Sequence, residues 1–522
     1  MQDEVQAGRA LGSVLAVSGA VVTGHLLDPA FTGRDPVMIG ELVSIPAGAG
    51  RVFGIVHRIR RGRRIDDKPS VEVHLLGEMT DAGFRRGVSC YPPLDVLISR
   101  ATQADIATVY AAPKVPHAPV GHLRQEPAIG AHVLIDGLLG QHFAVLGSTG
   151  SGKSCAVTVV LSAVLDRCPF AHVLLLDPHA EYGAAFGDRA LCLDQSSLEL
   201  PYWLLTFEEI AAILTSGQGD RAYAEGAILR DGILRAKQIY AGDADGSCRI
   251  TVDTPIPYRL SDLAAAIEDA MGTLAKAEGV AAYRHLLARL AGVREDPRYR
   301  FLFQSLLVRD SMQAVLAHLL RLPTAGRPIT VVDLSGVPSE IVNVVVSLLC
   351  RLIFDFGLWS DRERSPPLLL VCEEAHRYVP GDGLPVFEPS RRAIDRIAKE
   401  GRKYGVSLCL VSQRPAELSA SALSQCGTIF ALRMSNERDQ AFVRNALPDG
   451  SDWLIRTLPA LGTGEAVAVG EGVLVPMQLR FSELPPDARP ASRTPSFADR
   501  WARDVEDDLL PATIARWRAQ RR

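Results

Sequence analysis

The sequence predicts an α/β protein in which a mostly parallel sheet lies between helices, with a small β-barrel before the sheet and a helical insertion within it. Residues 1–115 are short β-type runs separated by glycine and proline turns. From Ala131 onward, apolar strand-like runs alternate with helix-compatible stretches, which is typical of a parallel sheet covered on both faces. Residues 205–320 interrupt this alternation with Ala-, Leu- and Arg-rich sequence that shows no series of strands.

The first 115 residues are expected to form a barrel of five or six strands, because the β-type runs are short and spaced as in small barrels. We expect strands at Ser13–Val22, Val37–Ile45, Arg51–Ile59, Val71–Gly77 and Asp95–Ile98. Three prolines, Pro113, Pro116 and Pro119, then predict a linker.

A strand, a glycine loop, a helix and a second strand form a βαβ unit early in the predicted sheet. Its strands are Phe143–Leu146 and His172–Leu176, and the helix between them is Lys153–Arg167. The other expected strands are Val133–Ile135, Ile329–Leu334, Leu368–Cys372, Gly405–Val411, Thr428–Leu432 and Gly464–Val469.

The chain is therefore expected to comprise a barrel, a core, an insertion and a tail, with bounds at 1–115, 120–204 with 321–484, 205–320 and 485–522. The tail is proline-rich and then amphipathic, because apolar residues recur near helical spacing at Phe497, Trp501, Val505, Leu509 and Trp517. A surface helix explains this pattern. Because the tail has little core of its own, a brace against a neighbouring subunit is the alternative.

The composition is that of a globular protein, with 47% hydrophobic and 22% charged residues. The longest apolar runs, Val342–Ile353 and Pro367–Cys372, are shorter than the roughly 18 residues that span a bilayer. The N-terminus lacks the basic start and apolar stretch of a secretion signal. Nine cysteines without a CxxC pair fit a reducing compartment and indicate no structural zinc. We therefore expect a cytoplasmic protein with no membrane segment.

Residues 147–154 read Gly-Ser-Thr-Gly-Ser-Gly-Lys-Ser and match the phosphate-binding pattern G-x-x-x-x-G-K-[ST]. Glycines let the backbone wrap closely around phosphates, and the helix that follows directs the positive end of its dipole to the same anion. Lys153 is expected to reach the β- and γ-phosphates of ATP, and the Ser154 hydroxyl is expected to hold Mg²⁺. A glycine-rich turn without a ligand is the alternative, and the strand before the loop argues against it. The residues expected to contact the nucleotide are Gly147, Ser148, Thr149, Gly150, Ser151, Gly152, Lys153, Ser154 and Cys155.

Two carboxylates, Glu373 and Glu374, follow the apolar run Leu368–Cys372. Open α/β sheets bind their ligands at the carboxyl ends of the strands, so we expect both carboxylates at the nucleotide. Glu373 would help to hold hydrated Mg²⁺, and Glu374 would polarise the attacking water. The alternative is an acidic pair that caps the N-terminus of a helix.

Other polar residues follow other strands of the predicted core. Asp177 either faces the nucleotide or the metal, or caps the turn that Asp-Pro begins, and the spacing favours neither reading. Gln413 lies at a strand end, where its amide could sense the γ-phosphate. From Arg391 to Lys403 there are six basic and two acidic residues, which fit a solvated helix face or an arginine offered to a neighbouring subunit's nucleotide.

Six motifs, in this order, resemble those of the HerA branch of the HerA/FtsK translocase superfamily. They are HFAVLGSTGSGKS from His142, DPHAEY from Asp177, TVVDLSG from Thr330, EEAH from Glu373, GRKYG from Gly401 and SQRP from Ser412. The resemblance covers nearly the whole chain. It implies a RecA-like P-loop NTPase core with a small N-terminal barrel of the HAS type and a helical insertion.

The resemblance also implies partners and roles. The family comprises hexameric ring ATPases that move double-stranded DNA, so it implies a homohexamer that uses ATP and Mg²⁺. The implied partner is a NurA-like nuclease, or a sirtuin-like or nuclease effector of antiphage defence. Arg402 becomes the candidate for an arginine that acts in trans, and Gln413 the candidate sensor. Two departures stand out: Glu373 replaces the family's usual Asp, and Gln141 replaces an arginine that many relatives carry before the histidine.

The leading hypothesis is an ATP-driven translocase or helicase that moves double-stranded DNA through a ring. A net charge of −4 argues against coating nucleic acid by bulk charge, so the ring would need a local basic lining. The alternative is a nucleotide-gated ring scaffold that activates a bound defence effector without sustained pumping. A conjugation-type coupling ATPase is a third possibility, which the lack of a membrane segment disfavours. In the insertion, a solvated helical face explains four basic residues as well as DNA contact does: Arg221, Arg230, Arg235 and Lys237.

Overall fold

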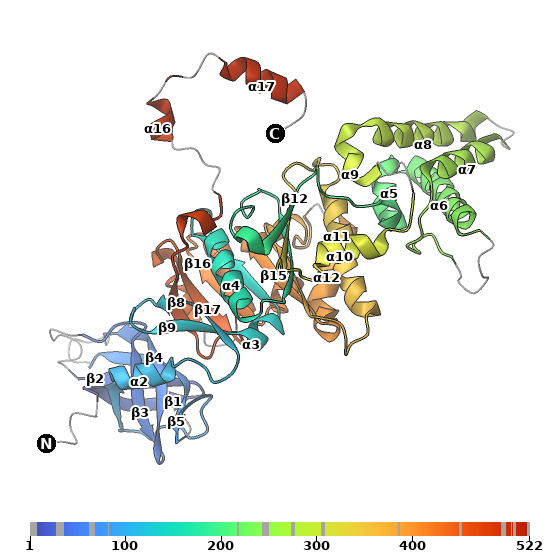
Figure 1. Ribbon diagram of the computed structural model, residues 1–522. Helices are drawn as coiled ribbons and strands as arrows, with labels where there is room; N and C mark the ends of the chain where they lie inside the picture. The colour runs from blue at the N-terminus through green and yellow to red at the C-terminus, as the bar shows by residue number, and fades with distance from the viewer. Residues whose placement is uncertain are drawn as a thin grey trace. The chain divides into compact units, whose positions relative to one another are not determined.

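The structure is a computed structural model, drawn in Figure 1, and it divides into two compact units. Unit 1 comprises residues 1–168, 381–383 and 407–484, and unit 2 comprises residues 169–380, 384–406 and 485–522. The residues described are 8–518 except 28–35, 62–67, 82, 217–218, 243–249, 273–276, 304–307, 385–386, 448–451, 492–496, 503 and 505–507.

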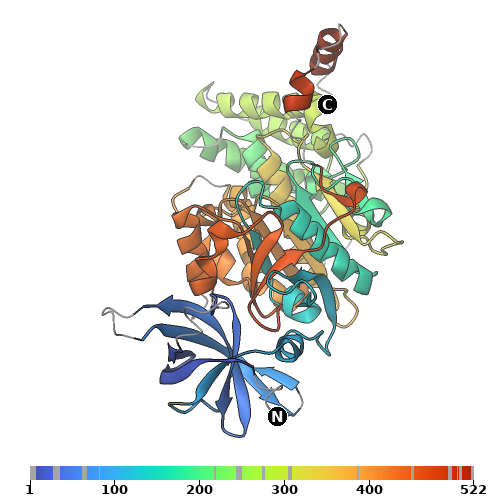
Figure 2. The same cartoon turned by 90° about the vertical axis from the view of Figure 1, so that its left-hand side faces the viewer.

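Unit 1 begins with a closed antiparallel barrel (Figure 2). Its six strands follow the order β2 (Val21–Leu26), β1 (Ala10–Ser18), β7 (Leu97–Arg100), β3 (Leu42–Ala47), β4 (Gly50–Arg60) and β5 (Ser70–Thr80). Pairing of β2 with β5 closes the ring, and β6 (Gly83–Arg86) extends β5 beyond it. The predicted small barrel is therefore confirmed. The single strand expected over Ser13–Val22 is wrong, because a turn at Gly19, with φ of 56°, splits it into β1 and β2.

The barrel is held together by side chains that alternate between its interior and its surface. In β2, for example, every second residue is buried, as period-two strand geometry requires. The buried set includes Val14, Val22, Val43, Val73 and Ile98, each no more than 1% exposed. Short helix α2 (Gln103–Val109) follows the last strand and starts with a reciprocal capping box between Thr102 and Asp105.

The rest of unit 1 contains a seven-strand stretch of sheet in which β10 (Phe143–Leu146) is the second strand. Parallel neighbours β15 (Val406–Ser412) and β16 (Thr428–Leu432) flank β10. Antiparallel strands then continue from β16 through β17 (Glu465–Gly470), β18 (Met477–Phe481), β8 (His117–Leu123) and β9 (Gly130–Leu134). The expectation of a mostly parallel sheet is therefore wrong for this part of the chain. The proline linker is also shorter than expected, because Pro119 lies in β8 at a bulge, where its missing N–H is tolerated.

Helix α4 (Lys153–Arg167) covers β8 and β10 and matches the predicted helix. Ten of its residues are buried, and it ends where Pro169 follows its C-cap residue Cys168. The other helices of unit 1 are short: α3 (Ile135–Leu139), α13 (Ala420–Ser424), α14 (Glu437–Ala446) and α15 (Asp452–Ile455).

Unit 2 holds four parallel strands in the order β12 (Ala190–Leu193), β13 (Ile329–Asp333), β11 (His172–Asp177) and β14 (Leu368–Cys372). Three of these strands were expected, and β12 was not, since it is only four residues long and half of it is not buried. Helix α11 (Val342–Trp359) packs against α12 (Glu388–Glu400). Among the described residues α11 is the one helix long and apolar enough to span a membrane, but 61% of it is buried, as in a core helix.

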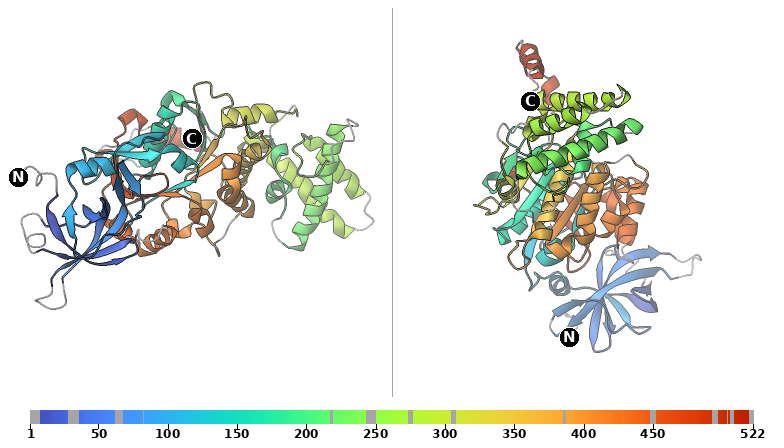
Figure 3. Two further views of the ribbon diagram at one scale, coloured as in Figure 1. Left: turned by 90° about the horizontal axis from the view of Figure 1, so that it is seen from below. Right: turned by 90° about the vertical axis from the view of Figure 1, so that its right-hand side faces the viewer.

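The described residues of 205–320 form helices joined by turns and coil, and they contain no strand. Three long helices lie side by side (Figure 3): α6 (Asp220–Ala241), α7 (Leu260–Gly272) and α8 (Ala277–Glu295). The shorter helices of this part of the chain are α5 (Phe207–Leu214), α9 (Arg300–Phe303) and α10 (Met312–Leu320).

Lys237 in α6 is not on a solvated face, so that interpretation is wrong for this residue. Its side chain is buried, and Nζ donates hydrogen bonds to the carbonyl oxygens of Val252 at 2.6 Å and Thr254 at 2.7 Å. Burial lowers the pKa of Lys237 to about 8. The ammonium therefore ties the chain after α6 to that helix, a role that periodicity alone could not reveal.

The tail contains α16 (Phe497–Trp501) and α17 (Leu509–Arg518), and both expose large apolar side chains. Trp501 is 80% exposed and Trp517 is 74% exposed. The predicted helical spacing also used Val505, which lies outside the described residues.

The pH dependence of barrel stability is expected to reflect Asp105, which accepts hydrogen bonds from Thr102 and from both terminal nitrogens of Arg51. Burial alone would raise the pKa of Asp105, but these bonds outweigh it and lower the pKa below the usual value. Because the pKa of Asp105 is lower in the folded state than in the unfolded chain, the ionised carboxylate stabilises the fold above about pH 4. This stabilisation is lost as the pH falls through the folded-state pKa. Asp105→Asn should cost about 1–2 kcal/mol at pH 7, with a smaller difference from wild type at about pH 2.5. Thermal unfolding at both pH values measures this, and an unchanged difference would contradict it.

Candidate active site

The predicted phosphate loop joins β10 to α4, so it lies at the carboxyl end of a buried strand and the N-terminus of a helix. Gly152 is the N-cap of α4 and has a left-handed backbone with φ of 98°, which favours glycine. At Gly147 a Cβ atom would lie 2.7 Å from Ser151 Oγ and 2.8 Å from Leu432 Cβ, so a side chain does not fit there. Both glycines of the motif are thus needed to shape the loop.

Hydrogen bonds to the neighbouring strands hold the loop in place. The backbone N–H of Gly147 donates to Ser412 O at 3.2 Å, and both N and Oγ of Ser148 donate to Arg433 O, at 2.9 and 2.8 Å. Lys153 folds back over the loop, where its Nζ donates to Ser148 O at 3.3 Å. Because Gly152 has no side chain with which to cap α4, the first N–H groups of this helix are suited to an anion.

Gln413 lies beside the loop, as its position after a strand suggested. Its Oε1 accepts a short hydrogen bond from the hydroxyl of Thr149. The parallel register explains this proximity, because Leu146 of β10 pairs with Ser412 of β15. The sequence did not indicate a second support, in which Gly464 N donates to Ser151 O at 3.0 Å. Cys155, which follows the motif, is exposed on the first turn of α4.

Glu373 and Glu374 follow β14 and are both buried, at 3% and 5% exposure. The hydroxyl of Tyr182 donates to Glu373 Oε2 at 2.8 Å. Glu374 has a left-handed backbone, with φ of 52°, at the start of a single turn of 3₁₀ helix, yet its side chain makes no capping bond. The capping interpretation therefore does not explain Glu374.

Two histidines flank the carboxylate of Glu374. His376 Nδ1 lies 3.2 Å from Oε2, and His179 Nε2 lies 3.9 Å from Oε1. His376 is the closer and the more buried of the two side chains, with 10% exposure against 47% for His179. Sequence reasoning assigned no role to either histidine, although both lie within the quoted motifs.

Asp177 organises the loop that carries His179 and Tyr182. Its carboxylate accepts hydrogen bonds from the backbone N–H of His179 at 3.2 Å and of Tyr182 at 2.9 Å. Burial raises the pKa of Asp177, and the nearby carboxylate of Asp333 acts in the same direction, while the backbone bonds oppose the shift. The structure thus shows the turn-capping role of Asp177, and its contact with a nucleotide stays a prediction.

Arg402 lies on the 3₁₀ turn Gly401–Tyr404 that follows α12, and its side chain is exposed. Three neighbouring arginines form ion pairs: Arg391 with Asp395, Arg396 with Glu400, and Arg392 with Glu208. Arg402 forms no such pair with any residue that the structure describes. The solvated-face interpretation therefore fits α12 itself, and Arg402 is exposed together with Lys399 and Lys403.

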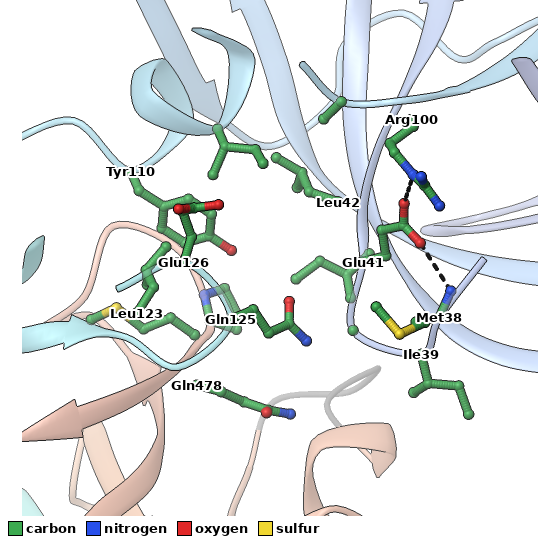
Figure 4. A pocket seen from close by; sticks show the side chains of 16 residues that line it. Met38, Ile39, Glu41, Leu42, Arg100, Tyr110, Leu123, Gln125, Glu126 and Gln478 are labelled. Carbon is green, nitrogen blue, oxygen red and sulfur yellow. Dashed lines mark hydrogen bonds and ion pairs between the residues drawn. The ribbon is translucent and has the colours of Figure 1, made fainter. Parts of the chain in front are cut away.

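The best-formed cavities lie away from the phosphate loop. One of about 410 Å³ in unit 1 is lined by strands β3 and β4 of the barrel and by β18 (Figure 4). Its wall is largely apolar, and Glu41 is already engaged with Arg100 and with the N–H of Met38. Another of about 370 Å³ in unit 2 lies beside Asp177 and Asp333. No residue of the phosphate loop lines either cavity.

Unit 1 therefore supplies a complete phosphate loop with the amide of Gln413 beside it, and unit 2 supplies a buried acidic pair at a strand end. A strand, a glycine loop and a helix in this geometry, together with two carboxylates at a strand end, are the features of a P-loop ATPase. The protein therefore belongs to this class.

Comparison with known proteins narrows this class. The family model described as the central domain of helicase HerA matches residues 118–353. The DNA double-strand break repair helicase HerA of Pyrococcus furiosus is 26% identical over 70% of this chain and 70% of its own length. Its namesake from Sulfurisphaera tokodaii is 23% identical over 95% of this chain and its full length. Among solved structures, VirB4 of Thermoanaerobacter pseudethanolicus has a TM-score of 0.51 and 15% identity, over 72% of this chain and 99% of that one. It shares the fold.

These matches support a HerA-type P-loop ATPase. The predicted fold class and resemblance are therefore confirmed.

Removing the Tyr182 hydroxyl is expected to loosen Glu373 without changing its charge. Tyr182→Phe should raise the Mg²⁺ concentration for half-maximal ATPase activity roughly 2- to 10-fold, the size of one lost hydrogen bond. Tyr378→Phe is the matched control, because its buried hydroxyl has no hydrogen-bond partner among the described residues. Titration of Mg²⁺ against ATP hydrolysis measures both variants, and equal curves for the two would contradict the role of Tyr182.

Proposed function

We propose that this ATPase moves double-stranded DNA, using ATP with Mg²⁺ in a homohexameric ring. The observation that supports its use of ATP most directly is the contact of Gln413 with Thr149, because the residue that we propose as the γ-phosphate sensor then lies against the phosphate loop. The relatives that match most of the chain are named as DNA double-strand break repair helicases. DNA is thus the substrate that both the motif set and these names favour.

Within one subunit, the phosphate loop would bind the triphosphate through its N–H groups, and Lys153 would exchange its bond with Ser148 O for the β- and γ-phosphates. Ser154 and Glu373 are suited to hold Mg²⁺, since both are hard oxygen ligands and Tyr182 orients Glu373. Bound Mg²⁺ would neutralise charge on the phosphates. Glu374 would polarise the attacking water, and His376 would hold its carboxylate in place.

Two exposed features support a ring. Arg402 points outward, so it suits the nucleotide of a neighbouring subunit better than its own. The tail helices α16 and α17 present apolar side chains that a neighbouring subunit would cover, as a brace, at residues Phe497, Trp501, Leu510 and Trp517. The proposal also includes the segment bounds, with a barrel that ends at residue 115, a helical insertion over 205–320 and a tail that begins at residue 485. A nuclease or a defence effector is the proposed protein partner.

ATPase activity with and without linear duplex DNA tests the proposal. Stimulation by DNA, together with displacement of a third strand from a triplex substrate, is expected of a translocase. ATP turnover that ignores DNA, with no displacement, would instead favour the nucleotide-gated scaffold.

Glu374→Gln is expected to retain ATP binding and to lose turnover, because the amide cannot polarise water as a carboxylate does. The rate should fall on the order of 10²- to 10⁴-fold. Thermal stabilisation by ATP reports binding, and phosphate release reports turnover. Glu400→Gln, a half-exposed carboxylate of α12, should leave both unchanged. Full turnover in Glu374→Gln would show that another residue positions the water.

Arg402 is expected to act on the neighbouring subunit. Arg402→Ala and Lys153→Ala should each be nearly inactive, and mixing the two should restore activity, because some interfaces then combine an intact loop with an intact arginine. Lys403→Ala is the matched control and should remain active. If the ATPase activity of the mixture never exceeds the summed activities of the two separate variants, Arg402 acts within its own subunit or takes no part in the reaction.

A further inference from the structure

The hairpin between β4 and β5 of the barrel carries positive charge that ATP hydrolysis does not use. From Arg58 to Lys68 the sequence has six basic and two acidic residues. Four of the basic residues are described, and three of these, Arg60, Arg61 and Lys68, are exposed. For a chain with a net charge of −4, this is a strong local excess.

Among the described residues of this hairpin, Glu72 is the carboxylate that pairs with the cations at its base. Glu72 lies 3.0 Å from Arg58 Nη1, 3.6 Å from His57 Nε2 and 3.9 Å from Arg60 Nη1. Arg60 is 61% exposed, so water screens its weak interaction with Glu72. Among the described residues of the hairpin, this one carboxylate faces four cations, Arg58, Arg60, Arg61 and Lys68.

The ATPase part of unit 1 adds a further cation to the same place. Helix α15 packs against β4, and the exposed Arg456 directly follows that helix. Burial is the main cause that lowers the pKa of His57, and the charges of Arg58 and Arg456 lower it further, so both arginines lie near this histidine. We call the surface formed by Arg58, Arg60, Arg61, Lys68 and Arg456 the basic face.

We propose that the basic face binds the phosphate backbone of double-stranded DNA. This rests on the proposed function and adds the barrel to the DNA-binding surface. Four of the five cations are arginines, whose planar fork matches phosphate oxygens. Arg58 and Arg60 are two residues apart on β4, so their side chains leave the same face of the strand.

The chemistry of the basic face favours DNA over an acidic protein. Protein interfaces depend on buried apolar or aromatic anchors, and none of the five residues provides one. Binding to a phosphate backbone needs only clustered cations, and it releases counterions. The basic face also joins barrel and ATPase residues, so DNA held there would contact both parts of unit 1.

The test compares two triple variants of the full chain. Arg60→Ala/Arg61→Ala/Arg456→Ala removes three exposed charges from the basic face and leaves the Arg58–Glu72 pair intact. Arg259→Ala/Arg284→Ala/Arg294→Ala removes three exposed charges from the helical insertion. Fluorescence anisotropy of a labelled duplex of about 30 base pairs, at salt from about 50 to 200 mM, gives affinity and salt dependence.

The basic-face variant should bind DNA on the order of 10-fold more weakly, with a slope of log K against log salt shallower by about 2–3. Its ATPase activity without DNA should be unchanged, and the insertion variant should bind like wild type. Equal affinity and slope in all three proteins, or an equal loss in both variants, would overturn the inference while leaving the proposed function intact. A basic-face variant that keeps its DNA affinity but loses binding to polyglutamate would assign the surface to an acidic protein instead. Wild-type protein that binds no duplex would overturn the proposed function together with this inference.

Discussion

The position of β10 between two parallel neighbours is the constraint on which the candidate site depends. Its pairing with β15 and β16 places three strand ends together at the carboxyl edge. The strand ends then provide Ser412 O and Arg433 O, and these carbonyls hold the first two residues of the phosphate loop. Buried His142 reinforces the base of β10, because its Nδ1 accepts the N–H of Leu408 at 3.0 Å. The loop is thus shaped by hydrogen bonds within the protein before any ligand binds, which spares part of the ordering cost of binding.

The acidic part of the site follows a similar logic in unit 2. The carboxylate of Asp177 accepts hydrogen bonds from backbone N–H groups of the following loop and so stabilises that loop. That loop brings Tyr182 to Glu373 and His179 to the vicinity of Glu374. A buried carboxylate that stays ionised needs such partners, because desolvation otherwise favours the neutral form. The motif that begins at Asp177 therefore places Tyr182 beside Glu373 and His179 beside Glu374.

Sequence reasoning predicted the parts of the fold that have a strong local signal. β10, β14, β16 and α4 have the expected bounds, since each is a continuous apolar run or follows the glycine motif. It missed β8, β12 and β18, which are short, or punctuated by proline, and depend on neighbours distant in the chain. The same reasoning located the loop and the glutamates by motif. It could not find the roles of Tyr182, His376 or Gly464, because these roles arise only from tertiary contacts.

The central claim is that each ATP site is completed by a neighbouring subunit, and sedimentation velocity combined with ATPase assays on the same samples tests it most directly. Across a dilution series with ATP, activity per chain should fall as the assembly of about 340 kDa, six times the 56.4 kDa chain, dissociates. A 56.4 kDa monomer that hydrolyses ATP at the full rate would contradict the account.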